Sequence, residues 1–209
     1  MMNTPRPHDL LWLTDSDALE DVSEEWVASQ WRPRFPVVVR RDVIHEGRIP
    51  VGVRGMRRDQ RAAGWANAAK IKRIVCPEEL ASRDLLVNSP FVSMPPVQGA
   101  IQLTLREWPW VWGITGSCGY ALATEVPVLH ADSDLDLLIR STSPIEREAL
   151  AQWQQVVGQL LCRADTQVET PHGAFALAEW LRDGRVLLKT NQGPQLVSDP
   201  WMFCRVDKR

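Results

Sequence analysis

The chain has few cysteines and no long apolar run, and both absences limit what it can be. Its four cysteines, at positions 76, 118, 162 and 204, are far apart and form no C-x-x-C pair. Such spacing without a secretory context predicts free buried thiols rather than disulfides or zinc ligands. No run of about eighteen apolar residues is present, and the Met1 end is polar and proline-containing, unlike a signal peptide. We therefore expect a soluble cytoplasmic protein without a membrane partner.

The chain also lacks an overall excess of one charge. Its formal net charge is −2 and its pI is about 6.1. Nucleic-acid-binding domains usually carry a basic surface over the whole domain. We therefore expect no nucleic-acid partner.

Proline and glycine divide the chain into two parts. Residues 88–99, NSPFVSMPPVQG, contain three prolines and one glycine, a composition that favours neither helix nor strand. We predict a linker there, between an N-terminal domain at 1–90 and a second domain at 99–209. Helices are expected over 15–30, 145–161 and 175–181, and strands over 37–39, 134–139, 164–170 and 186–190. Interleaved strands and helices indicate an α+β fold in which helices flank a mixed sheet.

Tryptophan is unusually frequent, with ten residues against one tyrosine. Trp108, Trp110 and Trp112 alternate as the side chains on one face of a strand do. Such a stripe can stack on an adenine base. A buried core is the favoured interpretation, because large aromatic side chains bury much area.

The segment Ser133-Asp134-Leu135-Asp136-Leu137 carries two acids at strand spacing. Residues two apart in a strand point to the same face, so Asp134 and Asp136 are predicted to lie side by side. Two neighbouring carboxylates repel each other when both are ionised, and a cation between them relieves that repulsion. Mg²⁺ suits such a pair because it binds one or two carboxylates together with phosphate oxygens and waters.

Gly116 and Ser117 form a turn after an apolar segment and precede a predicted helix. Glycine permits a backbone conformation that other residues avoid, and serine can cap a helix starting near Cys118. Free backbone N–H groups at a helix start hold phosphate oxygens. A Gly-Ser pair alone is a weak indication of function. Its combination with Asp134 and Asp136 predicts metal-assisted nucleotidyl transfer.

Gly-Ser followed by SDLDL resembles the nucleotidyltransferase superfamily that includes DNA polymerase β and the aminoglycoside nucleotidyltransferases. In that superfamily the turn holds a triphosphate and the aspartates hold Mg²⁺. Two departures argue against an antibiotic-modifying enzyme. The sixteen residues between Ser117 and Asp134 form a long spacer, and Cys118-Gly119-Tyr120 replaces the usual small-residue-Arg-Gly.

A second resemblance covers nearly the whole chain. It is carried by RPHDLLWL (6–13), PVVVRRD (36–42), IPVGVRGMRRDQRAAGW (49–65), GSCGYALAT, SDLDLLI and DTQVETPHGAFALAEW (165–180). Together these segments resemble the phosphoribosyl-dephospho-CoA transferases of malonate decarboxylase, which are holo-acyl-carrier-protein synthases. The resemblance implies triphosphoribosyl-dephospho-CoA as donor, a serine of the apo acyl carrier subunit as acceptor, and Mg²⁺ as cofactor. It also implies a nucleotidyltransferase-like sheet with a smaller N-terminal α+β domain.

The superfamily places a third carboxylate on a strand after the next helix. Asp165 and Glu169 are predicted to share one strand face, and either acid is a candidate metal ligand or general base. Asp165 is favoured because it lies near the start of the strand. Lys189, on the last predicted strand, is a candidate phosphate contact.

Positive charge is concentrated between Arg40 and Arg73, a stretch that contains ten basic and three acidic residues. Such a stretch attracts an anionic partner, which here means the triphosphate and pyrophosphate of the donor, an acidic carrier or nucleic acid. Arg54, Arg57 and Arg58 are the candidate phosphate contacts, since arginine binds phosphate through a planar fork. A solvated basic surface is the alternative interpretation.

Two other functions stay open at this point. One is a nucleotidyltransferase that uses an ordinary nucleoside triphosphate on a small-molecule hydroxyl. The other is a non-catalytic module that binds a carrier subunit. The paired acids and the Gly-Ser turn disfavour the second, because a module without catalysis has no need of them.

Overall fold

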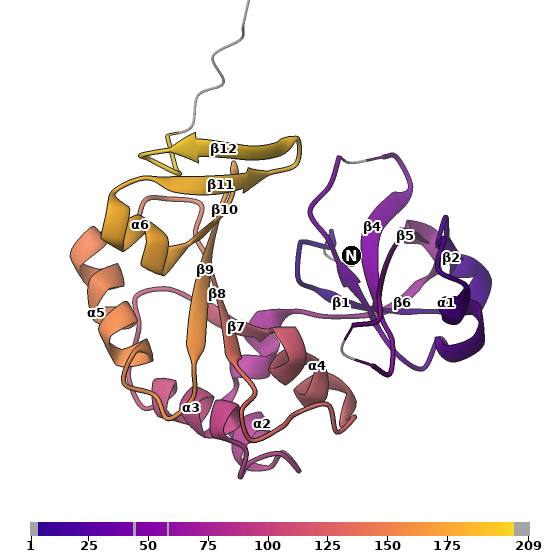
Figure 1. Cartoon of the computed structure of the whole chain (residues 1–209), viewed down its shortest axis with the longest axis horizontal. Helices are drawn as coiled ribbons and strands as arrows, with labels where there is room; N and C mark the ends of the chain where they lie inside the picture. The colour runs from indigo at the N-terminus through magenta and orange to yellow at the C-terminus, as the bar shows by residue number, and fades with distance from the viewer. Residues whose placement is uncertain (1–3, 44, 58, 203–209) are drawn as a thin grey trace, which may run out of the picture. The chain divides into compact units, whose positions relative to one another are not determined.

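The computed structural model describes residues 4–43, 45–57 and 59–202 and belongs to the α+β class. The chain divides into two units that meet between Cys76 and Pro77. Each unit contains one six-stranded sheet (Figure 1). The boundary therefore lies earlier in the chain than the predicted linker at 88–99.

Unit 1 is a sheet with one short α-helix. Its strands are β1 (Leu10–Leu13), β2 (Leu19–Glu20), β3 (Val37–Val39), β4 (Arg48–Arg54), β5 (Arg61–Asn67) and β6 (Ile71–Val75). The helix α1 spans Glu25–Gln30, and the 3₁₀ turns η1 and η2 span Ser16–Ala18 and Ala68–Lys70. The strand order is β2-β5-β4-β3-β1-β6, and neighbouring strands run antiparallel.

The core of unit 1 follows the two-residue alternation of its strands. Val37 and Val39 of β3 point inward, as do Val51 and Val53 of β4. Trp31, directly after α1, belongs to the same buried cluster as these valines. The helix predicted over 15–30 forms only at its end, because Leu19 and Glu20 pair with β5 instead.

Unit 2 carries the other sheet and most of the helices. Its strands are β7 (Trp112–Thr115), β8 (Leu135–Arg140), β9 (Ala164–Thr170), β10 (Gly173–Ala176), β11 (Val186–Thr190) and β12 (Gly193–Val197). Its helices are η3 (Pro77–Ala81), α2 (Arg83–Val87), α3 (Pro95–Leu103), α4 (Gly116–Thr124), α5 (Arg147–Val157) and α6 (Leu177–Asp183).

The sheet of unit 2 is mixed, as predicted. Its order is β12-β11-β10-β9-β8-β7, and only the β8–β9 pair is parallel among the pairs of the described strands. Trp153 of α5 is fully buried and donates a hydrogen bond from Nε1 to Thr166 Oγ1 of β9 at 2.9 Å. Helix α5 therefore covers the sheet face that carries Thr166 and Val168, while Asp165 and Glu169 point to the opposite face.

The three tryptophans pack against the core, with Trp112 buried and Trp108 and Trp110 half-buried. Trp112 opens β7, but Trp108 and Trp110 precede the strand. The rings of Trp108 and Trp112 lie 4.8 and 5.7 Å from that of Trp153, measured between centroids. This supports the core interpretation over a base-stacking surface.

Other predicted elements need correction. Strands β3 and β9 and the strand β8 after Asp134 form where expected, whereas residues 95–99 begin helix α3 instead of a linker. Pro95 and Pro96 occupy its first turn, where the missing N–H is not needed. Phe175 belongs to β10, and the predicted helix begins only at Leu177. Strand β12 has no counterpart in the prediction.

Candidate active site

The parallel pairing of β8 and β9 brings two of the predicted carboxylates together. Asp136 of β8 and Asp165 of β9 are direct neighbours in the register. Directly opposed residues of neighbouring strands point to the same sheet face. The two carboxylates thus share the face opposite α5, although they are separated by 28 positions in the chain, from 137 to 164.

Asp134 lies immediately before β8, and its negative charge acts on the carboxylate of Asp136. Burial raises the pKa of Asp136 above its ordinary value, and the negative charges of Asp134 and Asp165 raise it further. Asp165 itself is exposed. The three acids therefore form one charge cluster that is open to solvent on one side.

Gly116 sits against this cluster because β7 pairs with β8. Thr115 at the end of β7 is the register neighbour of Asp136, and Gly116 follows with a positive φ of +63°. A Cβ placed on Gly116 would lie 1.9 Å from Asp136 Oδ2. Glycine is required twice here, once for the left-handed backbone and once for the space that the carboxylate occupies.

Helix α4 starts at this point, so its N-terminus faces the acid cluster. Gly116 and Ser117 are its first two residues, and Thr115 is the N-cap. The helix thus begins two residues earlier than predicted. Backbone N–H groups in a first helical turn have no partner within the helix and suit an anionic oxygen. Cys118 lies behind them, buried, and burial raises the pKa of its thiol to about 12. That thiol is neutral near pH 7 and is no nucleophile.

The donor set fits Mg²⁺. All three acids offer oxygen ligands, which this ion prefers, and a cation relieves the repulsion that raises the pKa of Asp136. Within the described part of the chain, the oxygens of the three aspartates do not all approach within 4.8 Å of one another. One or two of them with phosphate oxygens suffice for Mg²⁺.

Glu169 and Lys189 lie away from the aspartates. Glu169 pairs in register with Arg140, and Lys189 pairs with Ala174, which is itself opposite Glu169. Glu169 is four residues further along β9 than Asp165. At the usual rise per strand residue this separates the two by about 13 Å. The structure brings neither residue to the aspartate cluster.

Glu169 instead belongs to a buried ion group within unit 2. Arg140 Nη1 donates to both carboxylate oxygens of Glu78 at 2.8 Å, and its Nε lies 3.5 Å from Glu169 Oε2. The three side chains are between 10% and 17% exposed. This group links η3 to β8 and β9.

The predicted phosphate contacts of unit 1 occupy a hairpin tip. Arg54 ends β4, and Arg57 is exposed and forms an ion pair with Asp59. Gly55 is enclosed, because a Cβ there would lie 2.5 Å from Gln60 Cβ. Arg58 lies outside the described residues.

A cavity in unit 1 is unsuited to phosphate. Its volume is about 520 Å³, and Val22, Val27 and Trp31 contribute apolar walls. Three acids, Asp21, Glu24 and Glu25, also line it. Carboxylates repel an anionic ligand, so this cavity does not extend the candidate site.

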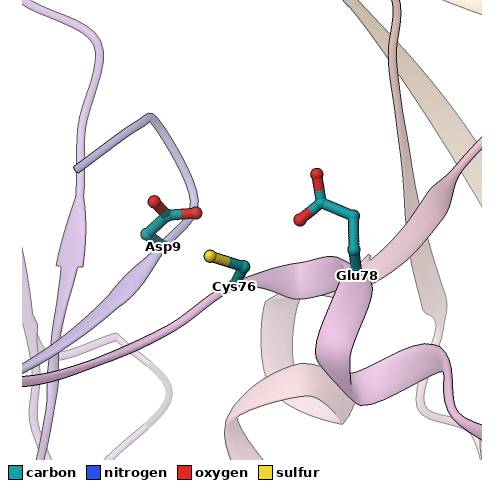
Figure 2. A group of neighbouring side chains, drawn as sticks. All are labelled: Asp9, Cys76 and Glu78. Atoms are coloured by element: carbon teal, nitrogen blue, oxygen red, sulfur yellow. The ribbon is translucent and has the colours of Figure 1, made fainter. Parts of the chain in front are cut away.

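Figure 2 draws a second group of ligand-type side chains. Asp9 and Cys76 both belong to unit 1, and their ligand atoms lie within 4.8 Å of each other. Asp9 is buried and accepts a hydrogen bond from the backbone N–H of Arg6 at 2.9 Å. Glu78, also drawn, is the acid of η3 that binds Arg140. Two ligands from unit 1 are fewer than a structural metal site needs.

The cysteine and membrane predictions can be checked over the same residues. Cys76, Cys118 and Cys162 are free thiols, as expected, but only Cys118 is buried and the other two are half-buried. Cys204 lies outside the described residues. No helix in 4–43, 45–57 and 59–202 combines the length and apolarity needed to cross a membrane.

Comparison with known proteins identifies relatives along almost the whole chain. Residues 6–77 match the family Phosphoribosyl-dephospho-CoA transferase MdcG N-terminal domain, and residues 86–200 match the family Phosphoribosyl-dephospho-CoA transferase MdcG C-terminal domain. The first range covers unit 1 from Arg6 onward together with Pro77, and the second lies in unit 2.

Individual relatives carry the same name. A phosphoribosyl-dephospho-CoA transferase of Klebsiella pneumoniae subsp. pneumoniae is 68% identical over 96% of this chain and 98% of its own length. Its counterpart in Azotobacter vinelandii is 44% identical over 94% of each chain, and that of Pseudomonas aeruginosa is 38% identical over 97% of each. No solved structure matches the chain.

Proposed function

Because this chain belongs to the phosphoribosyl-dephospho-CoA transferase MdcG family, and is therefore a transferase, we propose the following reaction. The enzyme moves the 2′-(5″-phosphoribosyl)-3′-dephospho-CoA unit from its triphosphate precursor to a serine of the apo acyl carrier subunit of malonate decarboxylase. The serine oxygen forms a bond to the α-phosphorus, the bond from that phosphorus to the bridging oxygen breaks, and pyrophosphate leaves. The serine proton passes to a carboxylate.

The observation that carries the proposal is the register of Asp136 beside Asp165, with Gly116 against them. Phosphoryl-type transfer requires positioning and charge neutralisation more than covalent chemistry by the protein. An exposed cluster of carboxylates next to a helix N-terminus supplies sites for both a cation and a phosphate.

In this proposal Asp134 and Asp136, together with Asp165, hold Mg²⁺. The ion would supply electrostatic stabilisation of the triphosphate and of the charge that develops on the leaving pyrophosphate. Asp165 is also the exposed carboxylate that can accept the serine proton. Gly116 and Ser117 contribute the first N–H groups of α4, and the serine hydroxyl, to the terminal phosphates.

A nucleotidyltransferase-like fold for unit 2 is part of the proposal. Support comes from the strand-turn-helix at β7 and α4, the acid-bearing β8 antiparallel to β7, and the third acid on the parallel β9. We also propose Arg54, Arg57 and Arg58 of unit 1 as phosphate contacts, because arginine binds phosphate through a planar fork.

The experiment is to incubate the full chain with Mg²⁺, triphosphoribosyl-dephospho-CoA and the apo carrier subunit. Intact mass of the carrier and a pyrophosphate assay are the readouts. We expect the carrier to gain one phosphoribosyl-dephospho-CoA unit and to release one pyrophosphate for each unit gained. Replacement of the carrier serine by alanine is the matched control and should abolish both signals.

An alternative function is transfer from an ordinary nucleoside triphosphate to a small-molecule hydroxyl. The same aspartate cluster would serve it. Pyrophosphate release from ATP with a small hydroxyl acceptor, and no gain in carrier mass, would replace the proposed reaction with this one.

A further inference from the structure

Arg163 is a cation beside the aspartate cluster to which the sequence assigned no role. It directly precedes β9, and its backbone carbonyl accepts a hydrogen bond from Leu135 N at 2.9 Å. Arg163 and Asp165 are two residues apart and share a strand face. Its Nη2 lies 3.5 Å from Asp165 Oδ2. Backbone pairing therefore anchors Arg163 at the end of β9 that carries the candidate site.

Arg163 also lies close to a second aspartate. Its ion-pair partner Asp165 is the direct register neighbour of Asp136, and its backbone is hydrogen-bonded to Leu135, the residue before Asp136. A polyphosphate bound through a cation on Asp136 and Asp165 would therefore come near the guanidinium.

The ion pair with Asp165 is weak enough for the guanidinium of Arg163 to bind another anion instead. Its side chain is 75% exposed and that of Asp165 is 61% exposed. Exposed ion pairs contribute little stability, and 3.5 Å is long for a charge-assisted hydrogen bond. A cation on the aspartates would compete with Arg163 for the carboxylate. The planar fork of an arginine then suits two phosphate oxygens.

We propose that Arg163 is a substrate-binding residue that contacts the triphosphate of the donor, adjacent to the carboxylates of Asp136 and Asp165. This rests on the proposed function for the identity of the donor. The binding chemistry itself is that of any metal-complexed polyphosphate. Arg163 would exchange its exposed partner Asp165 for phosphate oxygens when the donor binds.

The test compares Arg163→Gln with the wild type and with Arg182→Gln. Arg182 is a matched control, because it is 71% exposed and also pairs with a nearby aspartate, Asp183. For Arg163→Gln we expect KM for the donor to rise roughly tenfold or more, with kcat within about threefold, as for the loss of ground-state binding. Arg182→Gln should match the wild type in both.

A second readout separates phosphate binding from a mere counter-ion role. Binding of inorganic tripolyphosphate in the presence of Mg²⁺ is measured by calorimetry on the full chain. Arg163→Gln should weaken this binding by a similar factor, and Arg163→Lys should fall between, because lysine keeps the charge without the fork. If Arg163 only balances Asp165, the variant would bind tripolyphosphate as the wild type does, which would overturn the proposal.

The calorimetric arm also keeps the two proposals distinguishable. If the wild type binds Mg²⁺-tripolyphosphate through Arg163 but never loads the carrier, the proposed reaction is wrong and the assignment of Arg163 stands. If the wild type loads the carrier and Arg163→Gln does so with unchanged KM, the reaction stands and the assignment of Arg163 is wrong.

Discussion

The carboxylate of Asp136 occupies the space into which a side chain at position 116 would project. An ideal Cβ on Gly116 lies 1.9 Å from Asp136 Oδ2, and the glycine holds a φ of +63°. A turn residue and a strand residue twenty positions later thus define one small volume. A larger residue at position 116 would displace the carboxylate of Asp136.

Gly116→Ala should therefore cost both stability and activity. Left-handed strain alone costs about 1–2 kcal/mol, and displacement of the Asp136 carboxylate should lower kcat by roughly 100-fold. Gly184→Ala is the control, since Gly184 has a φ of +68° and no atom within 4 Å of its Cβ position. Thermal unfolding and the transfer assay should show the strain in both variants and the catalytic loss only in the first. Equal activity in both would contradict the proximity of Gly116 and Asp136.

Asp136→Asn should stabilise the protein at neutral pH while abolishing transfer. Burial and two acidic neighbours raise the pKa of Asp136, so its ionised form is disfavoured in the folded state. A raised carboxyl pKa contributes stability below the unfolded value near 3.8, and this is lost as pH rises through the folded value. The advantage of the variant in melting temperature should therefore grow as the pH rises above the unfolded value and through the raised folded value.

Asp183→Asn is the comparison variant, for which a change in melting temperature of the opposite sign is expected. The hydrogen bond from Arg182 lowers the pKa of this exposed carboxyl. Loss of this charged carboxylate should slightly destabilise the protein at pH values above the ordinary aspartate pKa. A melting temperature for Asp136→Asn that falls below the wild type at every pH would refute the electrostatic account.

Arg140→Met should be strongly destabilising. It leaves Glu78 and Glu169 without their shared cation in a site where all three side chains are at most 17% exposed. Removing one partner of a buried ion group typically costs about 3–5 kcal/mol. Urea unfolding measures this, with Arg182→Met as the exposed control, expected within about 0.5 kcal/mol of wild type. A loss below about 1 kcal/mol would mean that the group is not buried in solution.

Asp165→Asn and Glu169→Gln should differ in catalysis. Asp165 adjoins Asp136 in the register, whereas Glu169 is four residues further along β9. We expect the first substitution to reduce kcat by at least about 100-fold, and the second to stay within a few-fold at temperatures where it is folded. Lys189→Ala should resemble Glu169→Gln. Circular dichroism checks that each variant is folded, and a catalytic loss confined to Glu169→Gln would exchange the roles of the two acids.

Local patterns predicted the acid-bearing strands well. Leu135, Leu137 and Ile139 share one buried face of β8, with Leu138 buried as well, and the two-residue period also holds in β9, where Thr166, Val168 and Thr170 are buried. Val37–Val39 form β3 because β-branched residues favour strands. These segments bury one face of a sheet, so their period of two has a direct physical cause.

The failures lie where long-range pairing overrode local preference. Leu19 and Glu20 pair with β5 instead of forming a helix, and Phe175 belongs to β10, where it pairs in register with Val168 of β9. The prolines near residue 95 were interpreted as a linker, although the first turn of a helix accepts proline.

The sequence by itself determined the family, the paired acids and the Gly-Ser turn, because those features are contiguous motifs read within a few residues. Only the tertiary structure decided between Asp165 and Glu169 as neighbours of Asp136, and only it placed Arg163 beside them. The reason is register. Both acids share one strand face, and the parallel pairing of β8 with β9 determines which of them lies opposite Asp136.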